Sequence, residues 1–478
     1  MTAQTILPAN SAASGGFEVA NSIRLDGNAY MYKDQSGGNR QIFTMSCWTK
    51  LTSGYGASAG SLLSVNGTDD DTNFHFGIDH GDASGGASDS LFCHIYGADA
   101  FRTTPLLRDY SAWYHIVLAV DTTQAAAENR MKVYVNNVQQ TLSQQGDYPD
   151  QNDNFGVNEN GARLGVGTHP GSVAAYALNS YLCEYVLIDG SQLTPASFGE
   201  ADEDSGIWKP IKVSGLTFGT NGFYLDFQAS GNLGNDANGG TDLTEVSIAA
   251  TDQSTDTCTN NFATMNPLDN FHQGTAFSEG NLKLVHTAGN RTWNTCNVAL
   301  SSGKWYCEIL KGATEHDTIG IHYKLSAGLT DRPDSDSGAW SFLGGKNYDD
   351  GSVKTDGGSI TYTILPTNSG DIVGLYLDLH NNKVYFGVNG TVAHSGVGIS
   401  IPAASTLENG HYYIFGGSDS TSTTMTHTWN FGSPAVAISS ANTDAEGFGS
   451  FEFSPSGTFD SASKDFLAIC TKNLAEYG

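Results

Sequence analysis

Three adjacent carboxylates, Asp69, Asp70 and Asp71, form the densest acidic cluster of the chain and follow the turn signal Asn66-Gly67. Neighbouring carboxylates repel one another, and a hard cation with oxygen ligands, such as Ca²⁺, relieves that repulsion. A solvated turn explains the cluster without a metal, and we favour that interpretation. Calcium at Asp69, Asp70 and Asp71 is the alternative, and no cofactor is required.

Carboxylates paired for glycoside hydrolysis are not found. A retaining glycanase needs an acid and a nucleophile about 5–5.5 Å apart, which a strand supplies at a spacing such as E-x-D-x-x-E. Four acidic residues of predicted strands stand without a partner at that spacing: Glu184, Glu308, Asp371 and Asp378. We therefore predict that the protein is not an enzyme.

Two histidine-containing stretches resemble acid/base or metal sets. The stretches are Glu315-His316-Asp317 and His75…Asp79-His80. Loop polarity explains the first, and alternation with Phe74 and Phe76 in a strand explains His75. No G-x-S-x-G, P-loop or H-E-x-x-H motif occurs in the sequence, so hydrolase and nucleotidase motifs give no support for catalysis.

Aromatic residues in Gly/Ser/Asp-rich stretches are the other candidates for chemistry. Tyr55, Tyr148, Trp340 and Tyr348 are predicted to lie in loops, and Asp349 follows Tyr348. Exposed rings beside polar loops suit contacts with sugars or proteins. We predict Trp340, Tyr348, Asp349 and Tyr55 as ligand contacts. The alternative is that these rings close the ends of a β-sandwich.

The stretch from Gly370 to Gly390 shows which elements must position such residues. Val373, Leu375 and Leu377 alternate with other residues at a period of two, which predicts a strand. A second strand follows from Val384 and ends at Asn389-Gly390, a strong hairpin signal. The composition agrees, because 57 glycines, 44 tyrosines and phenylalanines and only 15% charged residues among 478 favour many short strands.

The first part of the chain resembles a known sandwich family. Trp113-Tyr-His-Ile-Val-Leu-Ala-Val-Asp121 and Met131-Lys-Val-Tyr-Val-Asn-Asn137 are similar to the core strand pair of laminin-G-like, concanavalin A-like domains. Leu25-Asp26-Gly27 and Tyr181-Leu-Cys-Glu-Tyr-Val-Leu-Ile-Asp189 are similar to the opening and closing strands of that family. The resemblance covers residues 17–200. It implies a sandwich whose rim often holds calcium.

The second part resembles SPRY domains. Gly303-Lys-Trp-Tyr-Cys-Glu-Ile-Leu310, the hairpin at 370–390, His411-Tyr-Tyr-Ile-Phe415 and Trp429-Asn-Phe-Gly432 follow the SPRY order. The resemblance covers residues 271–434 and implies a ligand surface on loops, which directs attention to residues 331–350. Taken together, we predict an all-β protein of two tandem concanavalin A-like (jelly-roll) sandwiches.

Three segments lie outside these sandwiches: an N-terminal arm at 1–16, an irregular connector at 201–270 and a tail at 435–478. The order of motifs between Gly206-Ile-Trp-Lys-Pro210 and Leu268 resembles a connector of tailed-bacteriophage structural proteins. The end of the chain, Phe466-Leu-Ala-Ile-Cys-Thr-Lys-Asn-Leu474, resembles the end of the same phage proteins.

Charge and cysteine content restrict the partners. The formal net charge of −28 lacks the basic footprint of a nucleic-acid-binding protein. No signal peptide or membrane span is predicted, so we expect no membrane insertion. The seven cysteines are scattered and predicted to be buried free thiols, which fits assembly in a host cytoplasm.

The resemblance to phage proteins implies a structural protein on the exterior of a virion. We predict a tail-fibre or receptor-binding component that contacts other virion proteins and adheres to host surface glycans or a receptor, as a homo-oligomer. One alternative is a capsid decoration or head-fibre protein. Another is a carbohydrate-active enzyme whose site is not recognised by motif.

Overall fold

The computed structural model describes residues 16–53, 59–67, 73–79, 89–95, 98–144, 148–270, 275–286, 293–312, 317–323, 339–344, 352–355, 358–361, 367–407, 414–418 and 424–478. It is nearly all-β, with 45% strand and 7% helix, which confirms the predicted fold class. The chain divides into two compact units, one ending at Asn260 and the other beginning at Asn261. The predicted domain boundaries at 200, 270 and 434 remain predictions.

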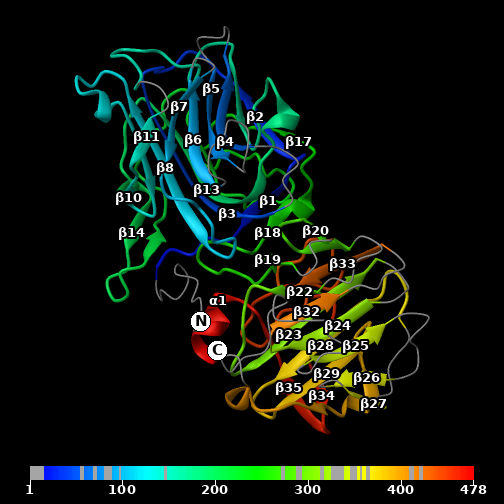
Figure 1. The fold of residues 1–478 in the computed structure, drawn as a ribbon. Helices are drawn as coiled ribbons and strands as arrows, with labels where there is room; N and C mark the ends of the chain where they lie inside the picture. Colours follow the sequence, from blue (N-terminus) through cyan, green and yellow to red (C-terminus); the bar gives the residue numbers. More distant parts are fainter. Residues whose placement is uncertain are drawn as a thin grey trace. The chain divides into compact units, whose positions relative to one another are not determined.

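The first unit contains two large antiparallel sheets, seen as its two strand layers in Figure 1. The first runs in the order β10 (Val138–Gln139), β9 (Met131–Val135), β8 (Trp113–Asp121), β3 (Ile42–Leu51), β13 (Asn179–Asp189), β1 (Ser22–Asp26), β18 (Gln253–Ser254), with β16 (Phe223–Leu225) also paired to β13. The second runs in the order β11 (Leu142–Gln144), β7 (Ala98–Thr103), β6 (Ser90–Ile95), β5 (Phe74–Asp79), β4 (Ala59–Asn66), β12 (Arg163–Val166), β2 (Tyr30–Asp34), β17 (Thr244–Val246). A separate pair joins β14 (Gly199–Ala201) to β15 (Trp208–Pro210).

Alternation along the strands decides which side chains enter the core between these sheets. Phe74, Phe76 and Ile78 of β5 belong to one buried cluster with Ile116 and Leu118 of β8. Because successive side chains of a strand point to opposite faces, the residues between them point outward. His75 of β5 is one of these, as the sequence pattern predicted.

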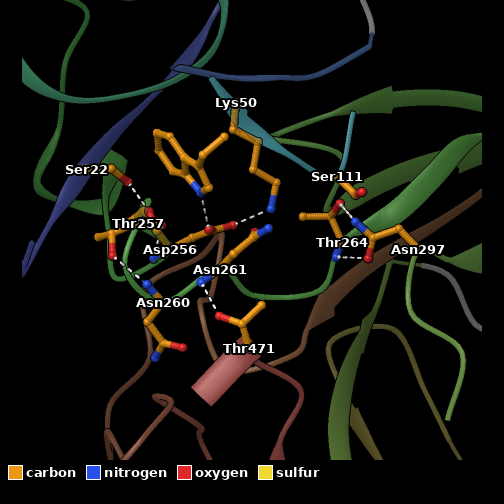
Figure 2. Close-up of polar contacts among 12 residues, drawn as sticks. Ser22, Lys50, Ser111, Asp256, Thr257, Asn260, Asn261, Thr264, Asn297 and Thr471 are labelled. Carbon is orange, nitrogen blue, oxygen red and sulfur yellow. Dashed lines mark hydrogen bonds and ion pairs between the residues drawn. The ribbon is translucent and has the colours of Figure 1, made fainter. Parts of the chain in front are cut away.

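The segment after residue 200 is attached to the first unit by buried polar contacts (Figure 2). Asp256 accepts hydrogen bonds from Lys50 Nζ at 2.8 Å and from Trp113 Nε1 at 3.1 Å. Ser22 Oγ donates to the Asp256 carbonyl at 2.6 Å. The predicted connector therefore contributes β16 and β18 to the first sheet and β17 to the second. Its Asp256 carboxylate is buried.

The second unit also contains two large sheets (Figure 1). One runs in the order β19 (Met265–Asn270), β22 (Trp293–Cys296), β32 (Ile414–Ser418), β24 (Asp317–His322), β25 (Ala339–Gly344), β26 (Ser352–Thr355), β27 (Gly358–Thr361). The other runs in the order β20 (Thr275–Ser278), β21 (Lys283–His286), β33 (Met425–Asn430), β23 (Lys304–Lys311), β28 (Ile372–Asp378), β29 (Lys383–Val388), β30 (Thr391–Val392). At its margin, β31 (Ile399–Ser400) pairs with β29 and β36 (Leu467–Ala468) pairs with β23.

The predicted hairpin is present as strands β28 and β29. Leu375 pairs with Phe386 and Leu377 with Val384, and all four side chains are buried in the core. Asn389 and Gly390 both have positive φ, 48° and 76°, at the turn from β29 to β30. This is the backbone conformation for which Asn-Gly is preferred in a two-residue hairpin.

The outer face of the same hairpin is covered by the C-terminal segment. Tyr376 and Tyr385 pack with Phe459, the last residue of β34 (Ser456–Phe459), and with Phe466, which follows β35 (Ala462–Asp465) of the same small hairpin. Glu308 of β23 accepts backbone hydrogen bonds from Glu452 at 3.0 Å and Phe453 at 2.7 Å.

Short helices complete the described part of the chain. The last is α1 (Thr471–Tyr477), and the others are the single-turn segments η2 (Ala127–Asn129), η3 (Val173–Ala175), η4 (Pro195–Ser197), η5 (Ala250–Asp252), η8 (Ala393–Gly396) and η9 (Ala404–Thr406). No helix among the described residues is long and apolar enough to cross a membrane. All seven cysteines are buried and free, which confirms that prediction.

Candidate functional site: the polar face of the first sandwich

The predicted contact residues fall mostly outside the described ranges. This is so for Tyr55, Tyr348 and Asp349, and for the predicted calcium ligands Asp69, Asp70 and Asp71. Trp340 lies within β25, where it pairs with Ile321 and Thr355, so its predicted loop position was wrong. Tyr148 lies in a loop and is half-buried. The binding roles of these residues remain predictions.

One row of outward-facing residues crosses six neighbouring strands of the second sheet in the first unit. Strand register places them side by side in the order His94, His75, Ser64, Gly165, Tyr32, Thr244. Their strand neighbours Phe74, Val65, Leu164 and Met31 lie in the core. We call the outward side chains of β6, β5, β4, β12 and β2 the polar face.

Histidines and a tyrosine gather at one end of this row. The His75 ring centroid lies 5.9 Å from His94, 5.7 Å from His169 and 4.4 Å from Tyr176. His75 Nε2 lies 2.7 Å from Ser61 Oγ, within hydrogen-bond distance. His75 is 4% exposed, whereas His94, His169 and Tyr176 are half-buried, so the last three form the accessible surface.

Burial keeps the rings of His75 and His169 uncharged. Burial, followed by the neighbouring His169 and His94, lowers the pKa of His75 well below its ordinary value. Burial likewise lowers the pKa of His169. At neutral pH these rings are therefore neutral hydrogen-bonding and stacking groups rather than cations.

A loop folds back across the middle of the polar face and holds His169 there. A Cβ atom on Gly165 would lie 2.5 Å from the Thr168 carbonyl oxygen and 2.9 Å from Pro170, so only glycine allows this close approach. Ser64 Oγ donates to the same Thr168 carbonyl at 2.6 Å. The loop is thus fixed to the sheet by its backbone.

The other end of the row combines an aromatic ring with an ion pair. The Arg163 guanidinium lies 3.9 Å from the centroid of the Tyr32 ring. It also donates to both carboxylate oxygens of Asp34, at 2.7 and 3.1 Å. The side chains of Arg163 and Asp34 are 45% and 65% exposed, so this pair adds little stability but presents oriented donors and acceptors to solvent.

The residues considered for catalysis or metal binding have other partners. Asp79, two residues after Gly77 on β5, forms a buried ion pair with Arg102. Within the described ranges, no group of three or more His, Cys, Asp or Glu side chains is arranged to hold a metal ion. Asp69, Asp70 and Asp71 lie outside these ranges.

The two glutamates are enclosed by donors. Tyr224 Oη donates to Glu184 Oε2 at 2.6 Å, and burial raises the pKa of Glu184 to about 7. Glu308 accepts from Tyr306 Oη at 3.0 Å and Asn430 Nδ2 at 3.2 Å besides two backbone amides, and burial raises its pKa as well. At 5% and 3% exposure neither carboxyl is presented to a substrate in this conformation.

Comparison with known sequences agrees with this architecture. Residues 25–177 match the profile of the concanavalin A-like lectin/glucanases superfamily. The first sandwich is concanavalin A-like. No curated protein matches the chain significantly in sequence.

Several solved structures match parts of the chain at low sequence identity. The SPRY domain of human HERC1 is 16% identical, with a TM-score of 0.28, over 34% of this chain and 96% of that one. A proposed carbohydrate binding protein from Bacteroides ovatus is 19% identical, with a TM-score of 0.36, over 49% of this chain and 60% of that one. A heptameric SAP-like pentraxin from Limulus polyphemus is 13% identical, with a TM-score of 0.27, over 37% and 80%. The fold of the chain is all-β, with a concanavalin A-like first sandwich.

The sequence contained part of the signal for the polar face. Tyr30, Tyr32 and Asp34 alternate at a period of two. The row itself depends on the register of six strands, and its members are up to 212 residues apart in the chain, from Tyr32 to Thr244. Local patterns do not specify such a register.

Proposed function

We propose that this protein is a non-enzymatic, glycan-binding structural component on the exterior of a tailed-phage particle, and that the polar face of the first sandwich contacts the glycan. The observation that carries the proposal is the joint presence of Tyr32, Arg163 and Asp34 at one end of a continuous cross-strand row. Aromatic rings offer apolar faces to a sugar, and bidentate charged groups hydrogen-bond to its hydroxyls. The superfamily matched by residues 25–177 includes lectins, which supports the same class of ligand.

The placement on a phage particle is supported by sequence resemblance alone. The motifs that carry this resemblance lie between residues 206 and 268 and at the end of the chain, 466–474, and both segments also contribute strands to the sheets. Their resemblance to tailed-phage structural proteins favours a tail fibre or receptor-binding component. A homo-oligomer that contacts other virion proteins is part of this proposal.

Binding and cleavage are separated by one experiment with the full chain. Polysaccharide extracted from host cell surfaces is incubated with the protein, and bound sugar and new reducing ends are measured in parallel. We expect retention without new reducing ends. New reducing ends would replace the proposal by a carbohydrate-active enzyme, and no retention would leave an architectural role.

The location has its own test. Antibody labelling of intact particles should place the protein on the tail. Label on the head would replace the fibre assignment by a capsid decoration or head-fibre protein.

A further inference from the structure

Three lysines and a histidine line one open hollow on the second unit. The hollow has a volume of about 580 Å³, and Lys304, His380, Lys383 and Lys464 lie at its wall together with Asp460 and Ser463. Sites for small molecules commonly have volumes of roughly 300–1,000 Å³. A basic hollow is unexpected in a chain with 50 acidic and 22 basic residues.

Strand register explains how the lysines come together. Lys304 at the start of β23 pairs with Asp378 at the end of β28, and Asp378 pairs with Lys383 at the start of β29. Their strand neighbours Trp305, Leu377 and Val384 are in the core, so this row faces outward. Lys464 of β35 reaches the same row from the C-terminal segment.

Asp378 and Asp460 both form ion pairs with Lys464, one of the three lysines. Lys464 Nζ lies 2.9 Å from Asp378 and 3.5 Å from Asp460. Burial of Asp378, which would raise its pKa, is outweighed by hydrogen bonds from Asn381 and Lys464, so the pKa of Asp378 lies below its ordinary value. Asp378 is therefore ionised at neutral pH, and Lys464 is held as its counter-ion.

The other two lysines are available to a ligand. Lys383 Nζ donates to Ser400 Oγ at 2.9 Å and to the Gly398 carbonyl at 3.3 Å, and its charge also interacts with the Asp460 carboxylate. The side chains of Lys304 and His380 form no hydrogen bond or ion pair with any described residue. Three lysines against two aspartates leave one positive charge in excess at the hollow.

We propose that this hollow binds the anionic substituent of an acidic glycan, a sugar carboxylate or phosphate, through Lys304 and Lys383. The inference rests on the proposed glycan-binding function and specifies a ligand class for a second site. The acidic substituent is favoured because the excess positive charge of the hollow attracts oxyanions. A sugar is favoured over an apolar ligand because hydroxyl, amide and charged groups form most of the wall, with Ala462 as the one aliphatic side chain among the described residues that line it.

Calorimetric titration of the full chain tests this assignment. The probes are a galacturonate oligosaccharide, a phosphorylated mannose oligosaccharide, a neutral maltose oligosaccharide and inorganic phosphate. We expect at least one acidic oligosaccharide to bind, with affinity that falls as salt concentration rises, because salt screens exposed charges. Lys304→Gln and Lys383→Gln should each weaken that binding about tenfold, whereas Lys212→Gln, which removes an exposed lysine of the first unit, should not change it.

The outcomes separate this inference from the proposed function. If sugars bind and neither Lys304→Gln nor Lys383→Gln changes their affinity, the assignment of the hollow as the binding site is overturned. The proposed glycan-binding function then remains. Binding of inorganic phosphate as tightly as of the oligosaccharides would replace the glycan by a free anion. No binding of any sugar would overturn both. Unchanged thermal unfolding of the two variants shows that lost binding is not lost folding, and Lys464 is left intact because it neutralises buried Asp378.

Discussion

Lys50 Nζ lies 2.8 Å from Asp256 Oδ2, and each side chain is 1% exposed. The two residues are 206 positions apart, so this ion pair attaches the segment around residue 256 to strand β3. Removing one partner of a buried pair leaves an uncompensated charge, which typically costs about 3–5 kcal/mol.

Asp256→Ala should therefore lower the free energy of unfolding by about 3–5 kcal/mol. Urea denaturation of the full chain, followed by tryptophan fluorescence, measures the change. Asp34→Ala is the matched control, because it breaks an exposed pair with Arg163 and should change stability by less than about 1 kcal/mol. Equal effects of the two variants would show that Lys50 and Asp256 do not anchor the segment.

Cys183 and Cys258 offer a second link between the same segment and β13. Their Sγ atoms lie 3.6 Å apart, both buried, and burial raises the pKa of Cys258 well above its ordinary value. A raised pKa makes the native Cys258 thiol slow to react, because the thiolate is the nucleophile. Refolding in oxidised glutathione should instead join them by thiol–disulfide exchange, with release of reduced glutathione.

The disulfide should lower the number of free thiols from seven to five and stabilise the chain by up to roughly 4 kcal/mol. Mass spectrometry and urea denaturation measure these two effects. Cys183→Ala should abolish both, and Cys47→Ala should leave both in place. A link between other cysteines would contradict the predicted pairing.

Glu184 predicts a dependence of stability on pH. Burial raises its pKa in the folded chain to about 7 from an ordinary value of 4.5. Between these values the folded state binds more protons than the unfolded state, so the stabilising contribution is present below about pH 4.5 and is lost as the pH rises through about 7. Full loss of this contribution lowers the free energy of unfolding by roughly 3 kcal/mol.

Glu184→Gln should remove this part of the pH dependence and make the chain more stable than the wild type at pH 8. Urea denaturation at pH 5 and pH 8 measures the difference between the two proteins. Glu128→Gln, which changes an exposed glutamate, should behave as the wild type does. A wild type and a Glu184→Gln variant with parallel pH profiles would contradict the raised pKa.

The fold was largely predictable because its signals are local. Alternating Val373, Leu375 and Leu377 specify a strand, and Asn389-Gly390 specifies a turn with positive φ. Trp340 shows the limit of such patterns. Its Gly/Ser/Asp-rich neighbours favour a loop, but pairing with Ile321 and Thr355 makes it part of a strand.

The candidate sites were less predictable because distant residues build them. Lys464 lies 86 residues from Asp378, and Lys304 meets both only through strand register. Tyr32 and Arg163 are each unremarkable in the sequence and become informative when β2 and β12 pair. Burial is also not readable from the local sequence: His75 is buried, whereas His94, His169 and Tyr176 around it are only half-buried.

The most direct test of the proposed function is glycan binding by variants of the polar face. Wild type, Tyr32→Ala, Arg163→Ala and the control Lys132→Ala, on β9 of the other sheet, are applied to an array of host surface glycans, and dissociation constants are measured for the sugars retained. We predict that Tyr32→Ala and Arg163→Ala weaken binding at least about tenfold, equal to about 1.4 kcal/mol, while Lys132→Ala binds as the wild type does. Equal affinities of all four proteins, or no retained glycan, would contradict the assignment of this face as a glycan-binding site.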